Sequence, residues 1–379
     1  MTEPLVSPEE FVGLAGLTHL CAGGEAPWLK AQEQVYAEFT HLKGAGERGR
    51  SKIFEIGENC RTRLGELWGV AGDRICFLSA ANDGMNLLSR GLVWNPGDNV
   101  VTTNLEFPSV AYAWRDLVAQ GVEVRMVPHR DWMVAEDDLM AAVDARTRVL
   151  AVSQVSFYTG QCVDLEALSA VRQQGVLFAV DATHASGVLR VPAGFTDLCI
   201  SSSYKWMLAT HGVAPCYVGE EAERQLTSQG YGWHNLQVRP GQQAIREAEV
   251  EVVPMPAKME PGNPPMLLIM HLQRALERIM EVGVWRIETH ARDLARELVE
   301  GLRERGSEVI VPPSRMSSSG NTCLFTEDAK QLQDQLASRG VLTWGDFGRL
   351  RVSTHLYNGS ADLDRFLLAL DEIEAESPA

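Results

Sequence analysis

Residues 176–206 read VLFAVDATHASGVLRVPAGFTDLCISSSYKW. Two short apolar runs lie in this stretch, Val176–Val180 and Asp197–Ser201, and each has the length of a buried strand. The first run ends in Asp181, and Lys205 follows the second. Because open parallel sheets bind ligands at the carboxyl ends of their strands, we expect this acid and this lysine to face a common ligand. Spacing alone leaves open a surface lysine and an acid that merely caps a helix.

The same alternation of short apolar runs and amphipathic patterns continues on both sides of this stretch. We predict further strands at Ile75–Leu78, Asn99–Thr103, Glu123–Val127, Arg148–Val155 and Val213–Gly219. Asp164–Gln174 predicts a helix, because Leu165, Leu168 and Val171 recur at a spacing of three. Strand–helix alternation over about 200 residues indicates right-handed βαβ units, and therefore an α/β fold with a mostly parallel sheet.

The texture of the sequence changes after Val253. Five prolines follow within a short stretch, at Pro254, Pro256, Pro261, Pro264 and Pro265. Proline clusters of this kind mark boundaries. We therefore predict a large domain over residues 18–253 and a small domain over residues 254–379, with residues 1–17 packing against the small domain.

A smaller α+β pattern fills the predicted small domain. Its expected helices and strands lie at Met266–Val282, Ile287–Arg305, Glu308–Val311, Asn321–Phe325, Glu327–Arg339 and Arg349–Ser353, with a last helix from Ser360. Gly283 and Gly340 stand where two of these helices should end. We expect the final residues, EIEAESPA (372–379), to fray.

Composition excludes several classes of function. Lys and Arg total 34 against 50 Asp and Glu, so the net charge of −16 argues against nucleic acid or an acidic membrane as partner. No run has the apolar length of a membrane span, and the N-terminus lacks the pattern of a signal peptide, so we expect a cytoplasmic protein. The seven cysteines form no CxxC pair, and we expect free thiols with neither a metal nor a disulfide.

Seven motifs give the chain a family resemblance. They are CFLSAANDGMNLL (76–88), NLEFPS (104–109), VSFYTGQ (155–161), VDATHASGVL (180–189), SSSYKWMLATHGV (201–213), EPGNP (260–264) and RLRVSTHLYN (349–358). In this order and spacing they resemble the class V aminotransferases, pyridoxal-phosphate enzymes of fold type I that include cysteine desulfurases and isopenicillin-N-epimerase-like proteins. The resemblance implies pyridoxal 5′-phosphate as cofactor, a seven-stranded type of sheet flanked by helices, and a homodimer with shared active sites.

The resemblance also implies catalytic roles. Lys205 matches the lysine that forms a Schiff base with the cofactor and then moves the α-proton of an amino-acid substrate. Asp181 matches the acid that pairs with the pyridine nitrogen. His184 stands where the family has Gln or His beside the phenolic oxygen of the cofactor. A packed histidine remains the alternative for His184.

Further residues match cofactor contacts. Ala80, Ala81 and Asn82 lie between a strand and a helix, where backbone N–H groups bind phosphate, although a plain helix start explains them too. By resemblance, Phe107 stacks on the ring, Ser202 and Tyr204 bind the phosphate, and Trp233 and Asn263 lie near the phosphate of the neighbouring subunit. Interface packing is the alternative for Trp233.

Arg351 matches the arginine that binds the substrate carboxylate, although Arg349 and Arg351 could form a solvated strand face. We expect Arg349 to lie at the surface. Phe157 stands where many relatives have Asn, which leaves His184 more important.

One absence bears on the reaction. Desulfurases carry a nucleophilic cysteine before the carboxylate-binding strand, but GVLTWGDFGRLRVS (340–353) holds none. Cys323 lies inside an apolar strand, where an inert thiol is expected. The sequence therefore favours an aminotransferase acting on an α-amino acid. The alternatives are a lyase acting at Cβ, of the C–S lyase type, and an amino-acid epimerase.

Overall fold

The computed structural model describes residues 2–227, 230–314 and 318–376. A seven-stranded sheet forms its centre, in the order β2-β8-β7-β6-β5-β3-β4. The strands are β2 (Ile75–Leu78), β3 (Asn99–Thr103), β4 (Glu123–Val127), β5 (Thr147–Ser153), β6 (Leu177–Asp181), β7 (Leu198–Ile200) and β8 (Ala214–Val218). β8 runs antiparallel to both of its neighbours and the other pairs are parallel, which confirms the predicted sheet.

Both faces of this sheet are buried. On β5, Leu150 and Val152 belong to the apolar cluster on one face, whereas Val149 and Ala151 belong to the cluster on the other. Because successive side chains of a strand point to opposite faces, a strand covered on both sides reads as a continuous apolar run. This is why the apolar runs of the sequence located these strands to within a residue or two.

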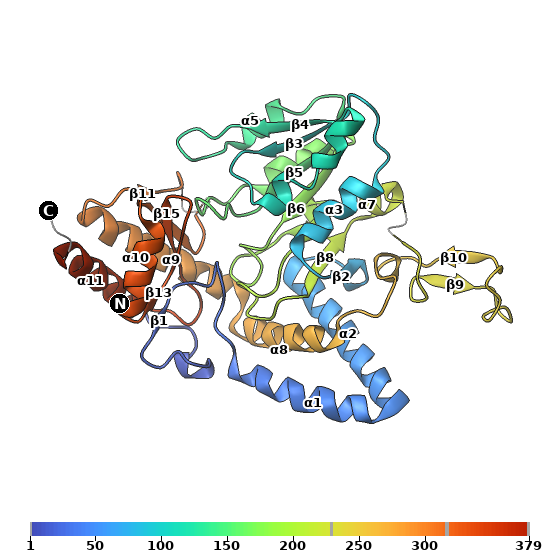
Figure 1. Cartoon of the computed structure of the whole chain (residues 1–379), viewed down its shortest axis with the longest axis horizontal. Coiled ribbons are helices and arrows are strands. Elements are labelled where there is room, and N and C mark those ends of the chain that lie inside the picture. Colours follow the sequence, from blue (N-terminus) through green and yellow to red (C-terminus); the bar gives the residue numbers. More distant parts are fainter. Residues whose placement is uncertain (1, 228–229, 315–317, 377–379) are drawn as a thin grey trace.

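Helices cover the sheet (Figure 1). Before β2 come α1 (Glu33–Gly44) and α2 (Gly46–Trp68), and the later helices are α3 (Ala81–Gly91), α4 (Pro108–Ala111), α5 (Glu136–Ala141), α6 (Leu165–Leu168), α7 (Glu220–Gln225) and α8 (Met266–Val282). The helix predicted at Asp164–Gln174 is confirmed, although its second half, Ser169–Gln174, continues α6 as a 3₁₀ helix.

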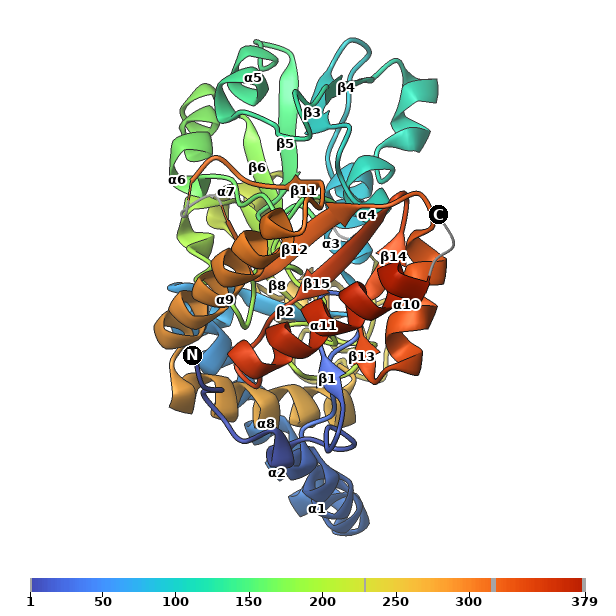
Figure 2. The same cartoon turned by 90° about the vertical axis from the view of Figure 1, so that its left-hand side faces the viewer.

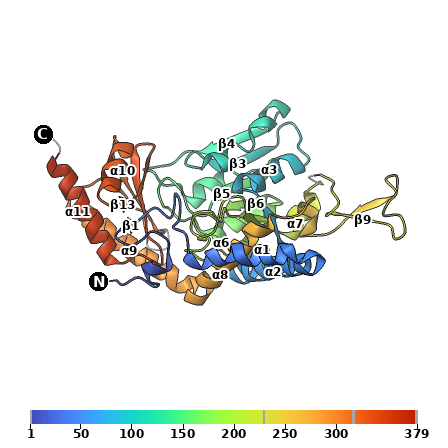
Figure 3. The ribbon, with the colours of Figure 1, turned by 60° about the horizontal axis from the view of Figure 1, so that its bottom comes forward.

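The sequence did not reveal α1 and α2. Glycines inside α2 lower its helix propensity, but they serve packing. A Cβ on Gly57 would lie 3.0 Å from Met266 Cε of α8, and one on Gly65 would lie 2.6 Å from the Val70 carbonyl oxygen. α2 and α8 therefore pack closely, as Figure 3 shows from below. The division of the chain at residue 253 stays a prediction.

A second, antiparallel sheet carries the strands β11 (Val309–Ile310), β12 (Asn321–Phe325), β15 (Arg349–Ser353) and β14 (Trp344–Asp346), in that order. Figure 2 shows α9 (Val284–Glu304) and α11 (Ser360–Glu376) in front of it, with α10 (Ala329–Ser338) at the side. Near the N-terminus, β1 (Thr18–His19) pairs in parallel with β13 (Val341–Leu342). A separate hairpin of β9 (Leu236–Val238) and β10 (Val250–Val252) projects from the opposite end of the molecule (Figure 1).

Gly283 and Gly340 end α8 and α10 as predicted, and their N–H groups bond Ile279 and Ala337 carbonyls. The expected fraying of residues 372–379 is wrong as far as Glu376, because α11 runs to that residue and buries Ile373. The last three residues lie outside the described part of the chain. In the described ranges, no helix is long and apolar enough to cross a membrane.

Candidate active site

A cavity of about 280 Å³ lies at the carboxyl ends of β5, β6 and β7. Nine predicted site residues line it: Ala80, Ala81, Asn82, Phe107, Asp181, His184, Ser202, Tyr204 and Lys205. They come together because β6 and β7 pair in parallel with Asp181 opposite Ile200, five residues before Lys205. Six further residues that sequence reasoning did not assign to the cofactor also line the cavity: Ser109, Ser153, Val155, Phe157, Thr183 and His211.

Lys205 is buried and lines the cavity. Its Nζ lies 3.2 Å from His184 Nε2 and faces the rings of Phe107 and Tyr204, 5.4 and 5.5 Å from their centres. Burial, together with the Arg351 cation, lowers the pKa of Lys205 to about 8, although the charge of Asp181 opposes this shift. A lysine amine in such a place is neutral, and hence nucleophilic, in a larger fraction of molecules than a surface lysine.

Asp181 ends β6 and is also buried. Its Oδ1 accepts the backbone N–H of Thr183 at 2.8 Å, and Thr183 Oγ1 in turn accepts the backbone N–H of Ser202 at 3.0 Å. Burial raises the pKa of Asp181, while the bonds from Thr183 and the charge of Lys205 lower it. A cationic partner in the cavity would relieve the cost of this buried carboxylate.

The N-terminus of α3 forms another wall. The Ala81 N–H donates to Ser202 Oγ at 3.3 Å, so the helix start and the chain after β7 meet here. Asp83 accepts the N–H groups of Ser79 and Ala80, both at 3.1 Å, and thereby holds the residues that precede the helix. Tyr204 stacks on His211, with ring centres 3.8 Å apart.

Trp233 and Asn263 lie outside the cavity. Asn263 Oδ1 accepts a bond from Arg50 of α2 at 3.2 Å, and the Arg50 guanidinium lies 5.7 Å from the Trp233 ring centre. Trp233 is 64% exposed. Their predicted place near the phosphate of a neighbouring subunit stays a prediction.

Arg351 lies behind the cavity, on β15, and does not line it. Its Nη1 donates to the Phe157 carbonyl at 3.0 Å, and its buried Nε has no hydrogen-bond partner in the described part of the chain. Burial lowers the pKa of Arg351 to about 10, and the nearby charge of Arg349 adds to this. An unpaired N–H on a buried cation is a place where an anion would be bound.

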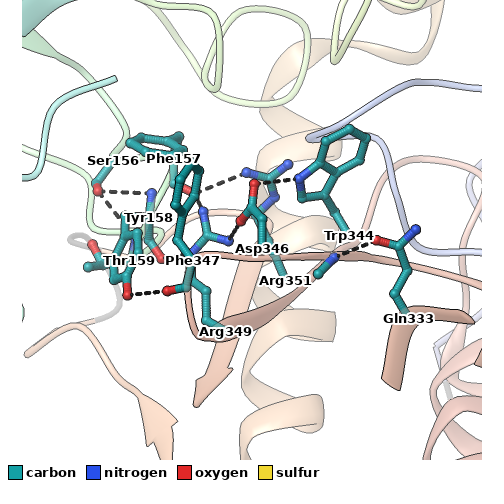
Figure 4. Close-up of polar contacts among 11 residues, drawn as sticks. Ser156, Phe157, Tyr158, Thr159, Gln333, Trp344, Asp346, Phe347, Arg349 and Arg351 are labelled. Atoms are coloured by element: carbon teal, nitrogen blue, oxygen red, sulfur yellow. Dashed lines mark hydrogen bonds and ion pairs between the residues drawn. The ribbon is translucent and has the colours of Figure 1, made fainter. Parts of the chain in front are cut away.

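The expectation that Arg349 lies at the surface is wrong, since none of the residue is exposed. Its Nε donates to the Tyr158 carbonyl at 2.7 Å, its Nη2 donates to the Phe157 carbonyl at 2.8 Å, and its Nη1 pairs with Asp346 (Figure 4). Alternation along β15 puts Arg349 and Arg351 on one face of the strand, and the turn 156–159 covers that face. Both arginines therefore bond the same carbonyl, that of Phe157.

This arrangement fixes the Phe157 ring. The ring meets Phe107 edge-on, with centres 5.1 Å apart, and both side chains line the cavity. On the other side, Trp344 Nε1 donates to Asp346 Oδ2 at 2.7 Å and holds the partner of Arg349. Hydrogen bonds thus join the β14–β15 hairpin to the turn 156–159, and Phe157 of this turn forms part of the cavity wall.

Glu106 is a half-buried acid that the sequence reasoning did not single out, although it adjoins Phe107. It accepts the N–H and the hydroxyl of Ser153 at the end of β5, both at 2.6 Å. Burial raises the pKa of Glu106 to about 7, against the effect of these bonds. Within the described residues, no group of three or more His, Cys, Asp or Glu could hold a metal ion.

Comparisons with known proteins agree on one family. The family model "Aminotransferase class-V" matches residues 29–366. An uncharacterized aminotransferase of Schizosaccharomyces pombe is 24% identical over 78% of this chain and 76% of its own length. A probable cysteine desulfurase of Pseudomonas putida is 27% identical over 95% of this chain and 89% of its own. A solved structure of a C-DES mutant with glycine covalently linked to the PLP cofactor has a TM-score of 0.86 at 18% identity, and covers 96% of this chain and 99% of its own.

Arg349→Met removes the cation from the Tyr158 carbonyl and the Asp346 carboxylate, and leaves the Phe157 carbonyl with Arg351 as its remaining donor. We expect the turn 156–159 to loosen, so that backbone amides of residues 155–162 exchange with deuterium at least about tenfold faster. Hydrogen-exchange mass spectrometry measures this. Arg339→Met is the matched control, because that arginine pairs with the exposed Glu372 and Glu376. Equal exchange in the turn for wild type and Arg349→Met would contradict the described role.

Glu106→Gln tests whether the pKa of Glu106 is raised. The folded state holds this proton up to about pH 7, whereas the unfolded chain loses it near the ordinary value of 4.5, so wild-type stability falls as pH rises between these values. Glutamine has no proton to lose. We expect the stability of Glu106→Gln relative to wild type to increase from pH 5 to pH 8, measured as urea midpoints of the cofactor-free protein. A difference that does not change with pH would show that burial does not raise this pKa.

Proposed function

Since the chain belongs to the class-V aminotransferase family of pyridoxal-phosphate-dependent enzymes, we propose that it is an aminotransferase acting on an α-amino acid. One observation carries the proposal. A buried lysine and a buried carboxylate stand on consecutive strand ends, beside a buried arginine with an unpaired N–H. An amine and an acid in one cavity, with a buried cation close enough to lower the pKa of that amine, are the groups that an amino acid bound to this cofactor requires.

The cavity has the donor set that pyridoxal phosphate needs. Bound there, the cofactor supplies an aldehyde that condenses with amines and a ring that withdraws electrons. The buried Asp181 carboxylate would hold a proton on the ring nitrogen, because burial makes a cationic partner favourable. The hydroxyls of Ser202 and Tyr204 would donate to the phosphate beside the N-terminus of α3, where the Ala81 N–H already donates to Ser202 Oγ.

Lys205 would act twice. Its neutral amine binds the aldehyde carbon, and the lowered pKa of Lys205, about 8, keeps a useful fraction of that amine neutral. The same Nζ would also be the base that takes the α-proton of the amino acid and the acid that returns a proton. His184 stands 3.2 Å from this nitrogen and restricts where it can point.

Arg351 would hold the carboxylate of the substrate. Its Nη1 is engaged by the Phe157 carbonyl, but its Nε is free to donate, and a carboxylate oxygen is the acceptor that a buried guanidinium binds best. Arg349 and the turn 156–159 hold the guanidinium in place.

The cysteines argue against a persulfide route. Cys323 on β12 is buried and burial raises the pKa of its thiol, so the nucleophilic thiolate is disfavoured. Cys21 is also buried with a raised pKa. The β14–β15 hairpin, where the resemblance places the nucleophile of desulfurases, holds no cysteine. Several relatives are nevertheless called probable cysteine desulfurases, so the reaction itself needs testing.

A single-turnover assay separates the reactions. The cofactor-loaded enzyme is mixed with a panel of amino acids, and products are identified by mass spectrometry. We expect one keto acid per active site, and more only after a keto-acid acceptor is added, because transamination leaves the amino group on the cofactor. Lys205→Ala should form no product. Pyruvate and ammonia in many-fold excess without an acceptor would contradict the proposal and show a lyase, and racemised amino acid would show an epimerase.

Arg351→Ala removes the carboxylate partner. We expect KM for the best amino acid to rise about a hundredfold, since a hydrogen bond to a charged group contributes about 1.5–3 kcal/mol. The decarboxylated amine of the same substrate should react equally poorly with wild type and variant. Steady-state kinetics measure both. Unchanged KM in Arg351→Ala would place the carboxylate elsewhere.

A further inference from the structure

His184 follows β6, is buried, and has partners on both ring nitrogens. Its Nε2 faces Lys205 Nζ at 3.2 Å. Its Nδ1 faces two groups: the indole Nε1 of Trp206 at 3.5 Å and the amide Nδ2 of Asn321 at 3.1 Å. Neither Trp206 nor Asn321 was singled out by the sequence, and neither lines the cavity.

The Trp206 partner decides which nitrogen carries the proton. An indole N–H can only donate, so His184 Nδ1 must accept and cannot itself hold a proton. A neutral imidazole has one N–H, which is then on Nε2. An imidazolium would place N–H groups face to face at Nδ1. Burial, together with the charges of Lys205 and Arg351, accordingly keeps the pKa of His184 well below its ordinary value.

Asn321 adds a second donor from the other sheet. It lies on β12, directly opposite Ser353 of β15, whose hydroxyl donates to Asn321 Oδ1 at 2.8 Å. With its oxygen engaged there, the amide turns its NH₂ group to His184. The packing is close: a Cβ on Gly23 would lie 2.7 Å from Ser353 Oγ and 2.9 Å from Asn321 Oδ1. The glycine allows this pair to sit where it does.

We propose that Trp206 and Asn321 are positioning residues that hold His184 as the neutral Nε2–H tautomer, so that an N–H donor faces Lys205 and the cavity. Such a donor can be accepted only by a lone pair. In the chain without cofactor the acceptor is the neutral amine of Lys205, which is the major form above its pKa of about 8, and with cofactor it is an oxygen of that ligand. The device selects the neutral amine, which is the form that attacks an aldehyde, and it does not depend on the substrate or on the type of reaction.

The other charged groups around His184 and Lys205 are consistent with a neutral histidine. The groups that act on Lys205 besides His184 are Arg351, Asp181, Glu25 and Cys21. Arg351 and Arg349 also act on His184. Arg351 opposes further positive charge at both positions and Arg349 opposes it at His184, while Asp181 and Glu25 favour the ammonium form of Lys205. The charges around Lys205 thus have opposing effects on its protonation. The hydrogen bond from His184 adds a preference for the neutral amine, because its N–H needs a lone pair to accept it.

Nuclear magnetic resonance of the cofactor-loaded enzyme, labelled with ¹⁵N-histidine, reads the tautomer directly. A protonated and an unprotonated ring nitrogen differ strongly in ¹⁵N shift, and His184→Gln identifies the signals by their loss. We expect a protonated Nε2 and an unprotonated Nδ1, both with the cofactor and after its removal. A proton on Nδ1, or on both nitrogens, overturns the proposal.

Asn321→Asp tests the amide group that donates to His184 from the small sheet. The carboxylate has the same shape but only accepts, so it should draw a proton to His184 Nδ1. The rate at which the cofactor-free chain takes up pyridoxal phosphate should then reach its midpoint at a pH about one unit or more higher, because fewer Lys205 amines are neutral. Unchanged histidine signals and an unchanged midpoint overturn the role of Asn321.

Two further variants complete the test. Thr322→Val is the matched control, since Thr322 is buried on the opposite face of β12 and the substitution should leave both readings as in wild type. Trp206→Phe keeps an aromatic ring but removes the N–H, and it serves if Asn321→Asp does not fold. A Nδ1-protonated fraction should appear in Trp206→Phe, and its absence overturns the role of Trp206.

Discussion

Burial of the Lys205 amine is the constraint on which the rest of the site depends. Taking an ammonium out of water is costly, and the Arg351 cation adds to that cost, so the pKa of Lys205 falls to about 8. The parallel pairing of β6 and β7 is what brings the lysine beside Asp181. The fold therefore sets the chemistry of the amine through position alone, before any ligand arrives.

The small antiparallel sheet completes what the large sheet begins. β12 contributes Asn321, which reaches His184, and β15 contributes Arg349 and Arg351, which hold the Phe157 carbonyl. The residues that line the cavity thus belong to the large sheet and its connections. Strands of the small sheet orient His184 and the turn that carries Phe157. A change in how the two sheets meet would alter the histidine and the arginine together, because both bond across the same junction.

Particular residues show how far the sequence carries. Strands buried on both faces have continuous apolar runs in the sequence. Asp181 and Lys205 could be identified as candidate site residues because they follow two such runs. Arg349 was misjudged because its acceptors, the carbonyls of residues 157 and 158, lie about 190 residues away along the chain and carry no side-chain signal. Asn321 was not seen for the same reason, since His184 is 137 residues distant. The glycines of α2, among them Gly57 at its contact with α8, concealed a helix.

The central claim is that Lys205 is the residue to which the cofactor attaches. Reduction of the cofactor-loaded enzyme with borohydride, followed by digestion and mass spectrometry, tests it most directly. We expect one phosphopyridoxyl group per chain, located on Lys205. A protein that retains no cofactor after reduction, or that carries it on a different lysine, would contradict the account.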